Sequence, residues 1–224
     1  MFSRLRPESP ETNTATSMAK RKGSHYAGTM QFYGITKAMN ASGEIVDVED
    51  VRRGKGCDCF CLSCNAPVVA RKGDIRMHHF AHVSGMNLCA YGLETSLCYV
   101  AKELYNEAGY VMAPPVTLNL HGKGIWTIKE TQKIEIAEVV IDKATYSKPH
   151  LLVTTKDGHK LCIEISVKNK IDDAKLKLII EHAVPTMEIN LSTIDQEIDR
   201  DALADLLINQ ITYKEWKYSR LSAK

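Results

Sequence analysis

Four cysteines stand within eight positions in the first third of the chain, and three histidines and a fifth cysteine follow soon after. The chain starts without an apolar signal segment and has no run of about eighteen apolar residues, so we expect a cytoplasmic protein that does not span a membrane. In that reducing compartment, clustered cysteines and histidines favour a metal site over disulfides. The residues are Cys57, Cys59, Cys61, Cys64, His78, His79, His82 and Cys89.

The spacing within this cluster indicates which residues could be ligands. Cys61-Leu-Ser-Cys64 is a C-x-x-C turn, which places two thiolates on adjacent corners of a tetrahedron around Zn²⁺. His79 and His82 follow about fifteen residues later and predict a Cys₂His₂ site, or a Cys₃His site if Cys89 replaces one histidine. Four protein ligands leave no position for water, so the zinc would be structural. Two surplus residues, Cys57 and Cys59, belong to another ligand arrangement or form a redox-sensitive pair.

Length and charge limit the number of domains and the extent of any nucleic-acid surface. A chain of 224 residues with 44% apolar residues can form one main domain and a small appendage. We expect a flexible tail over 1–27, a zinc-binding module over 28–92 and the main domain over 93–224. Because the net charge is only +2, a nucleic-acid surface would have to be local.

Hydrophobic periodicity predicts an α/β main domain. Apolar residues at helical spacing predict a helix from Leu93 to Ala108 that stops at Gly109, and Pro114-Pro115 breaks the chain after it. We expect a second helix from Asp172-Asp173 that buries Leu176, Ile179 and Ile180, and a last helix from about Asp195. The expected strands are Met30 to Ile35, Ile45 to Val48, Ile134 to Ile141, Leu151 to Thr155, Leu161 to Val167 and Thr186 to Leu191, with a hairpin turn at 156–160. This order indicates a mixed sheet flanked by helices.

Acidic residues occur where strands should be buried. Glu138 and Glu164 each sit among apolar residues of a predicted strand, and Glu94 lies on the polar face of the first helix. Carboxylates brought together by strands and a helix can bind Mg²⁺ or Mn²⁺ and activate water against a phosphodiester, with Lys168 or Lys175 stabilising the phosphate charge. The alternative is that both strand glutamates face solvent, and the pattern alone leaves it open.

Several stretches, in this order, resemble the CoiA-like competence protein family. They are Cys-Phe-Cys-Leu-Ser-Cys-Asn-Ala-Pro (59–67), His-Phe-Ala-His (79–82), Glu-Thr-Ser-Leu-Cys-x-x-Ala-Lys-Glu (94–103), Pro-Pro (114–115), Ile-Glu-Ile-Ser-Val-Lys-Asn-Lys-Ile-Asp-Asp-Ala-Lys (163–175) and Met-Glu-Ile-Asn-Leu-Ser (187–192). The resemblance covers about 55–195. It implies a zinc-finger-like N-terminal module and a restriction-endonuclease-like core of the PD-(D/E)XK type, whose sheet carries a metal-binding acidic pair.

Carried over to this sequence, the resemblance makes Glu94 the helix carboxylate, Ala137-Glu138 the Pro-Asp position and Glu164 the second strand acid, with Asp142 as a substitute for the first. The sequence departs from the pattern in having Cys98 for an expected histidine, glutamate for aspartate, and Ser166 where a lysine completes the motif.

Together these features predict a metal-dependent DNA endonuclease or DNA-processing protein, acting in DNA uptake, recombination or defence against foreign DNA. The alternative is a catalytically inactive nuclease fold that binds DNA or a protein partner. We expect DNA as partner and leave a protein partner or homo-oligomer open.

Overall fold

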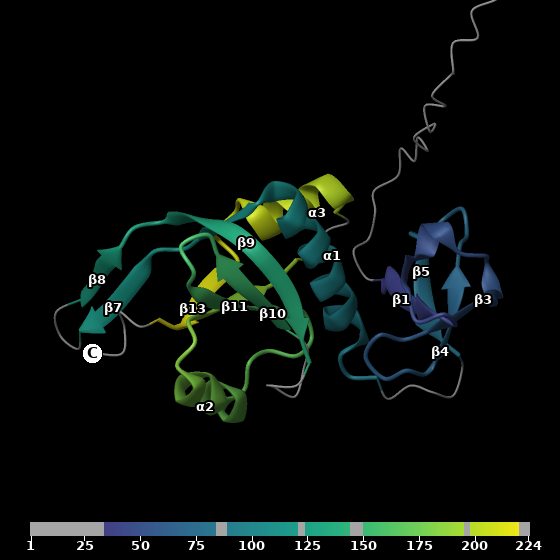
Figure 1. Cartoon of the computed structure of the whole chain (residues 1–224), viewed down its shortest axis with the longest axis horizontal. Coiled ribbons are helices and arrows are strands. Elements are labelled where there is room, and N and C mark those ends of the chain that lie inside the picture. Colours follow the sequence, from purple (N-terminus) through teal and green to yellow (C-terminus); the bar gives the residue numbers. More distant parts are fainter. Residues whose placement is uncertain (1–33, 84–88, 121–123, 144–149, 195–197, 220–224) are drawn as a thin grey trace, which may run out of the picture.

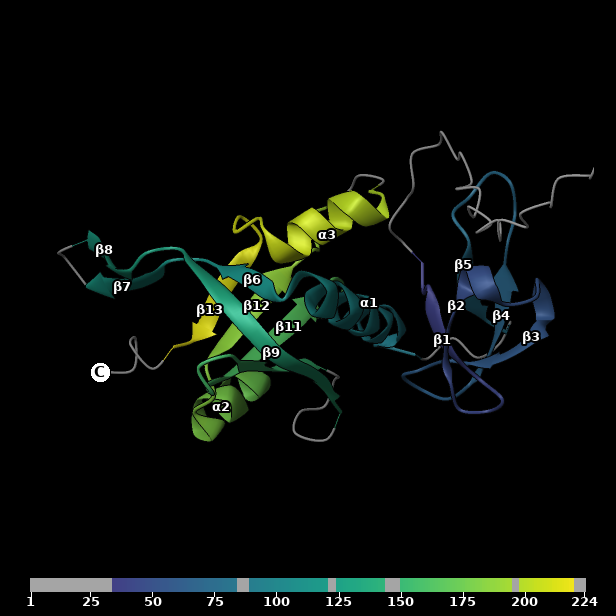
Figure 2. The same ribbon diagram turned by 45° about the horizontal axis from the view of Figure 1, so that its top comes forward.

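The computed structural model describes residues 34–83, 89–120, 124–143, 150–194 and 198–219. The predicted tail over 1–27 and part of the first predicted strand lie outside these residues. Among the described residues, none of the helices has the length and apolar character needed to cross a membrane. Two sheets and three α-helices account for most of the described chain, as Figures 1 and 2 show from two directions.

The N-terminal part is an antiparallel sheet of five strands in the order β2-β1-β3-β4-β5. Its interior holds small and sulfur-bearing side chains around Phe80. The expected turn at 40–43 is present, since Asn40 Oδ1 accepts the N–H of Ser42 and Gly43 has a φ of 83°. The elements are β1 (Lys37–Asn40), β2 (Ile45–Asp47), the 3₁₀ helix η1 (Val48–Asp50), β3 (Gly54–Phe60), β4 (Pro67–Arg71) and β5 (His79–His82).

The C-terminal part is a mixed sheet of six strands in the order β13-β12-β11-β10-β9-β6, which confirms the expected mixed α/β architecture. The β11–β12 pair is parallel because α2 connects the two strands, and the other pairs are antiparallel. Two helices, α1 and α3, cover one face, and α2 lies on the other (Figures 1 and 2).

The bounds of these elements follow the chain from residue 92 to residue 218. They are α1 (Gly92–Ala108), β6 (Tyr110–Ala113), β7 (Val116–Leu120), β8 (Gly124–Lys129), β9 (Gln132–Asp142), β10 (His150–Thr155), β11 (Lys160–Ser166), α2 (Asp173–His182), β12 (Thr186–Asn190), α3 (Arg200–Ile208) and β13 (Lys214–Tyr218).

The helices agree with the sequence expectation except at one point. The first helix ends as predicted, because Gly109 takes the left-handed conformation with a φ of 72°. In α2, Ile179 is buried but Ile180 is 52% exposed, so the prediction that both are buried is wrong. The last helix, α3, starts at Arg200, where the side chain of Asp199 caps it by accepting the N–H of Ala202, and the predicted start near Asp195 lies outside the described residues.

In the N-terminal sheet only β2 coincides with a predicted strand range, and in the C-terminal part four strands were not predicted. Two of them, β7 and β8, form a separate hairpin in which every residue of β8 is exposed, so no core pattern marks it. The other two, β6 and β13, are the edges of the six-stranded sheet. In β13 the sequence Lys-Glu-Trp-Lys-Tyr has charges at positions that an interior strand would fill with apolar residues.

Candidate metal and acidic sites

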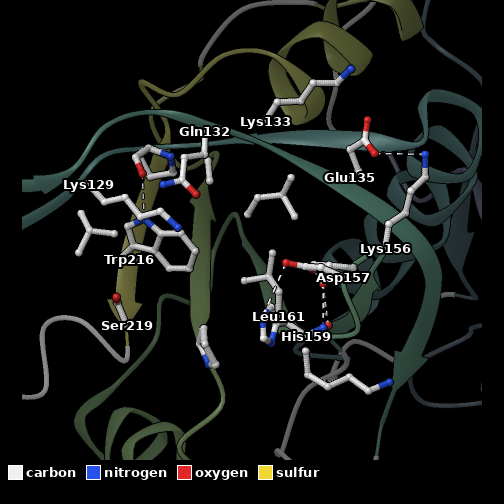
Figure 3. A pocket seen from close by; sticks show the side chains of 17 residues that line it. Lys129, Gln132, Lys133, Glu135, Lys156, Asp157, His159, Leu161, Trp216 and Ser219 are labelled. Atoms are coloured by element: carbon white, nitrogen blue, oxygen red, sulfur yellow. Dashed lines mark hydrogen bonds and ion pairs between the residues drawn. The ribbon is translucent and has the colours of Figure 1, made fainter.

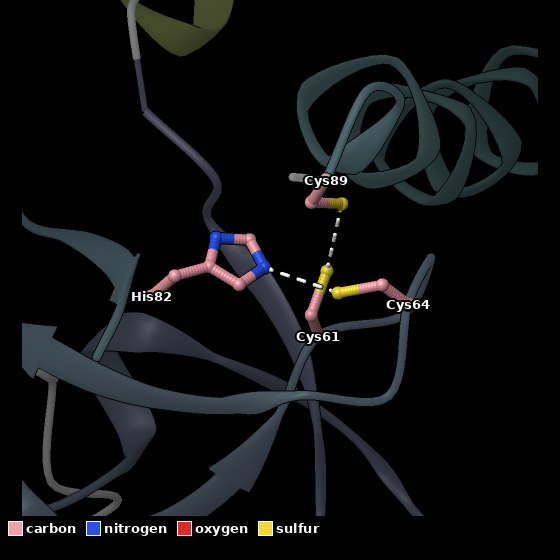
Figure 4. A group of neighbouring side chains, drawn as sticks. All are labelled: Cys61, Cys64, His82 and Cys89. Carbon is pink, nitrogen blue, oxygen red and sulfur yellow. Dashed lines mark hydrogen bonds between the residues drawn. The ribbon is translucent and has the colours of Figure 1, made fainter. Parts of the chain in front are cut away.

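A knuckle of four side chains lies at the junction of the two parts of the molecule. Cys61 and Cys64 come from the turn after β3, His82 is the last residue of β5, and Cys89 precedes α1 (Figure 4). One ligand atom from each, Sγ or an imidazole nitrogen, lies within 4.8 Å of the others. We call these four residues the knuckle.

The local backbone explains why the two turn cysteines converge. The N–H of Cys61 donates to the carbonyl of Ala66, and the N–H of Asn65 donates to the carbonyl of Cys61, both at 2.9 Å. Asn65 has a φ of 56°, a left-handed conformation that asparagine tolerates better than most residues. The N–H of Ser63 points at Cys61 Sγ, 3.4 Å away. The predicted turn therefore holds both thiols on one side.

The spacing of the knuckle atoms fits tetrahedral zinc. Cys61 Sγ lies 3.7 Å from Cys89 Sγ, and Cys64 Sγ lies 3.3 Å from His82 Nε2. Zinc bonds of about 2.3 Å to sulfur and 2.0–2.1 Å to nitrogen at tetrahedral angles would separate such atoms by about 3.8 Å and about 3.6 Å. The knuckle is therefore compatible with a structural zinc ion held as Cys₃His.

The structure leaves His79, one of the predicted ligands, out of the knuckle. His79 and His82 both belong to β5, and residues three apart on a strand point to opposite faces of the sheet. His79 Nδ1 instead lies 2.9 Å from the carbonyl oxygen of Met77. The surplus pair is placed in the N-terminal core, where the Cys57 thiol donates to the carbonyl of Val68 and that of Cys59 to the carbonyl of Cys57.

Protonation distinguishes the knuckle thiols from one another. Burial raises the pKa of Cys61 to about 12, although N–H groups of the turn oppose this. Burial also disfavours the thiolate of Cys89, but hydrogen bonds from Ser63, Cys64 and Cys61 outweigh it and hold the pKa of Cys89 below its usual value. Because zinc binds thiolates, the metal must displace the proton of Cys61.

A second group of polar residues crosses the six-stranded sheet on the face covered by α2. Cross-strand register pairs Asp142 of β9 with His150 of β10, and Glu164 of β11 with Glu188 of β12. His150 joins the two pairs, because its Nε2 lies 3.8 Å from Asp142 Oδ2 and its Nδ1 lies 4.0 Å from Glu164 Oε1. We call these four residues the acidic row.

The charges of the acidic row are buried and matched by lysines. Glu164 is fully buried, and its Oε1 lies 2.7 Å from Nζ of Lys175 on α2. Glu188 Oε2 lies 3.0 Å from Nζ of Lys217, and Glu188 Oε1 accepts a hydrogen bond from the Ser166 hydroxyl. Burial disfavours the ionised form of Glu188, but these bonds outweigh it and hold the pKa of Glu188 below its usual value.

Two of the predicted catalytic residues lie away from the acidic row. Glu138 is exposed on β9 opposite Thr154, four residues from Asp142 and therefore about 13 Å along the strand. The first strand acid beside Glu164 is thus Asp142, the substitute, rather than Glu138. Lys168 follows β11 with an exposed side chain, and its backbone N–H donates to Glu94 Oε1.

Glu94 is buried in the first turn of α1 and ties the two sites together. Its Oε1 accepts the backbone N–H groups of Lys168 at 2.9 Å and Asn169 at 3.2 Å, just after β11. The Asn169 side chain also donates to the carbonyl of Ala90, the residue after knuckle ligand Cys89. No hydrogen-bond partner of Glu94 Oε2 is found among the described residues. The loop after β11 is therefore hydrogen bonded both to α1 and to Ala90, the residue that follows Cys89.

Two members of the acidic row were missed in the sequence. His150 follows Pro149 and stands fourteen residues before Glu164, with the predicted hairpin turn between them. Glu188 sits between Met187 and Ile189 in a buried strand, the same signal that identified Glu164. His150 also forms a group with Cys162 and Glu164 whose ligand atoms lie within 4.8 Å of one another.

Residues 44–91 match the family model described as the competence protein CoiA, N-terminal domain. The chain is therefore CoiA-like in this region. The match covers all four knuckle residues and ends one residue before α1, so it bears out the predicted resemblance over the N-terminal part alone. Comparison with curated proteins and with solved structures gives no match.

Beyond the CoiA N-terminal domain, the sequence departures have structural counterparts. Cys98, where the family pattern has histidine, is fully buried in the core one turn after Glu94. Ser166, in the place of the motif lysine, hydrogen bonds to Glu188, while the amine beside Glu164 belongs to Lys175 of α2.

Proposed function

We propose that this protein is a metal-dependent DNA endonuclease or DNA-processing enzyme of the competence type, with its centre at the acidic row. The observation that carries the proposal is the row of contacts from Asp142 through His150 to Glu164, with the Lys175 amine 2.7 Å from the Glu164 carboxylate. The order α1-β9-β10-β11-α2-β12 supports the nuclease-like core implied by the family resemblance.

In this proposal each residue of the acidic row has a separate role. The carboxylate of Glu164 and the Nδ1 atom of His150 would hold a divalent cation, Mg²⁺ or Mn²⁺, and Asp142 would orient the His150 ring from the Nε2 side. When bound, such an ion supplies an activated water and neutralises charge on the phosphodiester. Lys175 would move its ammonium group from Glu164 to the phosphate, where it stabilises the charge that develops during hydrolysis.

We propose zinc as the occupant of the knuckle, with a structural role. Four protein ligands fill its coordination sphere, and thiolate and imidazole are the donors that zinc prefers. The same reasoning supports separate N-terminal (28–92) and nuclease-like (93–224) units, and a cytoplasmic location in which thiols stay reduced.

A second candidate is an inactive nuclease fold that binds DNA or a protein partner. It is favoured by the burial of Glu164 and by Ser166 in the motif lysine position. In this version the Lys175 ammonium takes the place of a metal ion and stabilises the fold without chemistry.

The deciding experiment compares two glutamates that differ in location. Purified wild type, Glu164→Gln and Glu138→Gln proteins are incubated with supercoiled and single-stranded DNA and Mg²⁺ or Mn²⁺, after metal analysis shows equal zinc content. Cleavage lost in Glu164→Gln and kept in Glu138→Gln assigns the chemistry to the acidic row. Equal cleavage by all three proteins contradicts that assignment, and DNA binding without cleavage by any of them supports the inactive candidate.

A further inference from the structure

The hairpin of β7 and β8 forms an arm that extends away from the rest of the molecule (Figures 1 and 2). It continues the β6–β9 pair past Pro114-Pro115, where the missing proline N–H groups interrupt the strand. Large apolar side chains on β8 are exposed, with Ile125 at 72%, Trp126 at 59% and Ile128 at 43%. We call residues 116–129 the arm.

Such an arm has little to stabilise it alone. A two-stranded ribbon is marginally stable in water, and exposed clusters of large apolar residues mark interaction sites. The charge of the arm restricts what that partner can be. The described residues of the arm, 116–120 and 124–129, contain no aspartate or glutamate and carry Lys129, so the arm is positively charged. This charge favours a polyanion.

A hollow of about 520 Å³ lies where the arm joins the end of the six-stranded sheet (Figure 3). Its lining combines an indole ring, from Trp216, with the basic side chains of Lys129, His159 and Lys160. The indole N–H of Trp216 donates to the carbonyl of Pro114 at 2.9 Å, which holds the ring in place. The volume suits a single small group and falls within the roughly 300–1,000 Å³ of ligand pockets.

The acidic side chains of this hollow are already paired. Glu135 Oε2 lies 3.3 Å from Lys156 Nζ, and Asp157 Oδ2 lies 3.6 Å from His159 Nε2. Lys133 turns away from the hollow in Figure 3, with its ammonium 4.4 Å from the centre of the Tyr110 ring. The uncompensated charge of the hollow therefore comes from Lys129 and Lys160.

We infer that the arm and this hollow bind single-stranded DNA, with Trp126 stacking on a base and Lys129 and Lys160 contacting phosphates. Stacking on an aromatic ring requires an unpaired base, and a duplex is too wide to enter the hollow. The inference rests on the proposed function in taking DNA as the partner, and it adds the form of the DNA and the surface that receives it.

The position of Lys160 connects this surface to the acidic row. Lys160 and Glu164 are both on β11 and are four residues apart, so their side chains point to the same face, about 13 Å apart along the strand. The Lys160 ammonium donates to the Thr154 hydroxyl on the neighbouring strand, which also places it on that face. A strand seated in the hollow would therefore extend toward Asp142, His150 and Glu164.

The test measures binding in a background where cleavage cannot interfere. Fluorescence anisotropy of a labelled oligothymidylate and of a blunt duplex is recorded with Glu164→Gln protein over a range of salt concentrations. Trp126→Ala should weaken single-strand binding roughly five- to a hundredfold, and Trp126→Phe should keep most of the affinity because the ring remains. The double change Lys129→Ala and Lys160→Ala should reduce the salt slope by about 1.4, since each single-strand phosphate contact contributes about 0.7.

A matched control is Lys177→Ala on α2, whose side chain is 78% exposed and lies outside the hollow. It should leave both affinity and salt slope unchanged. Unchanged single-strand affinity in Trp126→Ala and in the double lysine variant would overturn the inference, and so would a preference for duplex DNA. If the arm binds single strands but wild type cleaves no DNA, the inference stands and the enzymatic proposal fails.

Discussion

The knuckle and the acidic row both contain potential metal ligands, but only in the acidic row are the ligands already paired with cationic side chains. In the knuckle, thiols and an imidazole face one another 3.3–3.7 Å apart and no cationic side chain lies among the four. In the acidic row, Lys175 and Lys217 already pair with Glu164 and Glu188. With zinc as its proposed occupant, the knuckle would depend on a metal for its stability, whereas the carboxylates of the acidic row are paired with lysines.

The largest expected effect is the loss of a knuckle ligand. Cys64→Ser should abolish zinc binding and unfold the five-stranded sheet, because structural zinc contributes roughly 10–16 kcal/mol in zinc-finger peptides. Metal analysis gives the stoichiometry, and hydrogen exchange of β3 to β5 reports the loss of structure. His79→Ala is the matched control and should keep its zinc. Zinc lost in His79→Ala, or kept in Cys64→Ser, would contradict the ligand set.

The next effect tests the acidic row without any metal. Lys175→Met removes the partner of a fully buried carboxylate and should destabilise the protein by about 3–5 kcal/mol in urea unfolding. Adding Glu164→Gln should restore most of that loss, because the charge is then gone. Lys177→Met on the exposed side of α2 should change stability by less than about 0.5 kcal/mol. A small effect of Lys175→Met would mean that Glu164 is protonated or hydrated.

The knuckle shows which parts of a site a sequence can reveal. Cys61 and Cys64 belong to one turn, so their three-residue spacing alone predicts that they converge. The choice between His79 and His82 depends on secondary structure, since a strand separates residues three apart and a helix would bring them together. Cys89 joins the site from the start of the segment that leads into α1, a placement that the spacing of the cysteines does not predict.

The acidic row shows what the sequence could not reveal, namely the register of neighbouring strands. Apolar neighbours correctly marked Glu164 as a buried strand residue, but they carried no information on which residue of the next strand lies opposite. That depends on register, and a shift of four residues along β9 separates the exposed Glu138 from Asp142. The arm was missed because its strands pack on no core, so the periodicity that identifies buried strands is absent.

A smaller effect concerns the link between the two regions. Glu94→Ala removes the acceptor for the N–H groups of Lys168 and Asn169 and should destabilise their loop by about 1.5–3 kcal/mol. Hydrogen exchange at these two amides should accelerate, and zinc removal should accelerate it as well, since Cys89 and Ala90 anchor the same segment. Glu107→Ala, at the exposed end of α1, is the control and should leave these amides unchanged. Loop protection that survives zinc removal would mean that the regions are independent.

The smallest expected effect is a pH dependence from Glu188. Its pKa lies below the ordinary value of 4.5, because bonds from Ser166 and Lys217 outweigh the effect of burial. A carboxyl group with a lowered pKa in the folded state stabilises the protein fully above its unfolded pKa, and the benefit disappears as pH falls through the folded pKa. Below about pH 4.5, the free energy of unfolding should therefore fall by at most about 1.4 kcal/mol per pH unit from this group.

Urea unfolding at a series of acid pH values measures that slope in wild type and in Glu188→Gln. The variant cannot titrate at this position, so its stability should depend less steeply on pH in the same window. Glu215→Gln is the matched control, because Glu215 pairs with the same Lys217 but is 71% exposed and its charge is screened by solvent. Equal slopes in wild type and Glu188→Gln would show that Glu188 has the same pKa in the folded and unfolded states. The acidic row would then contain only Glu164 as a strongly paired carboxylate.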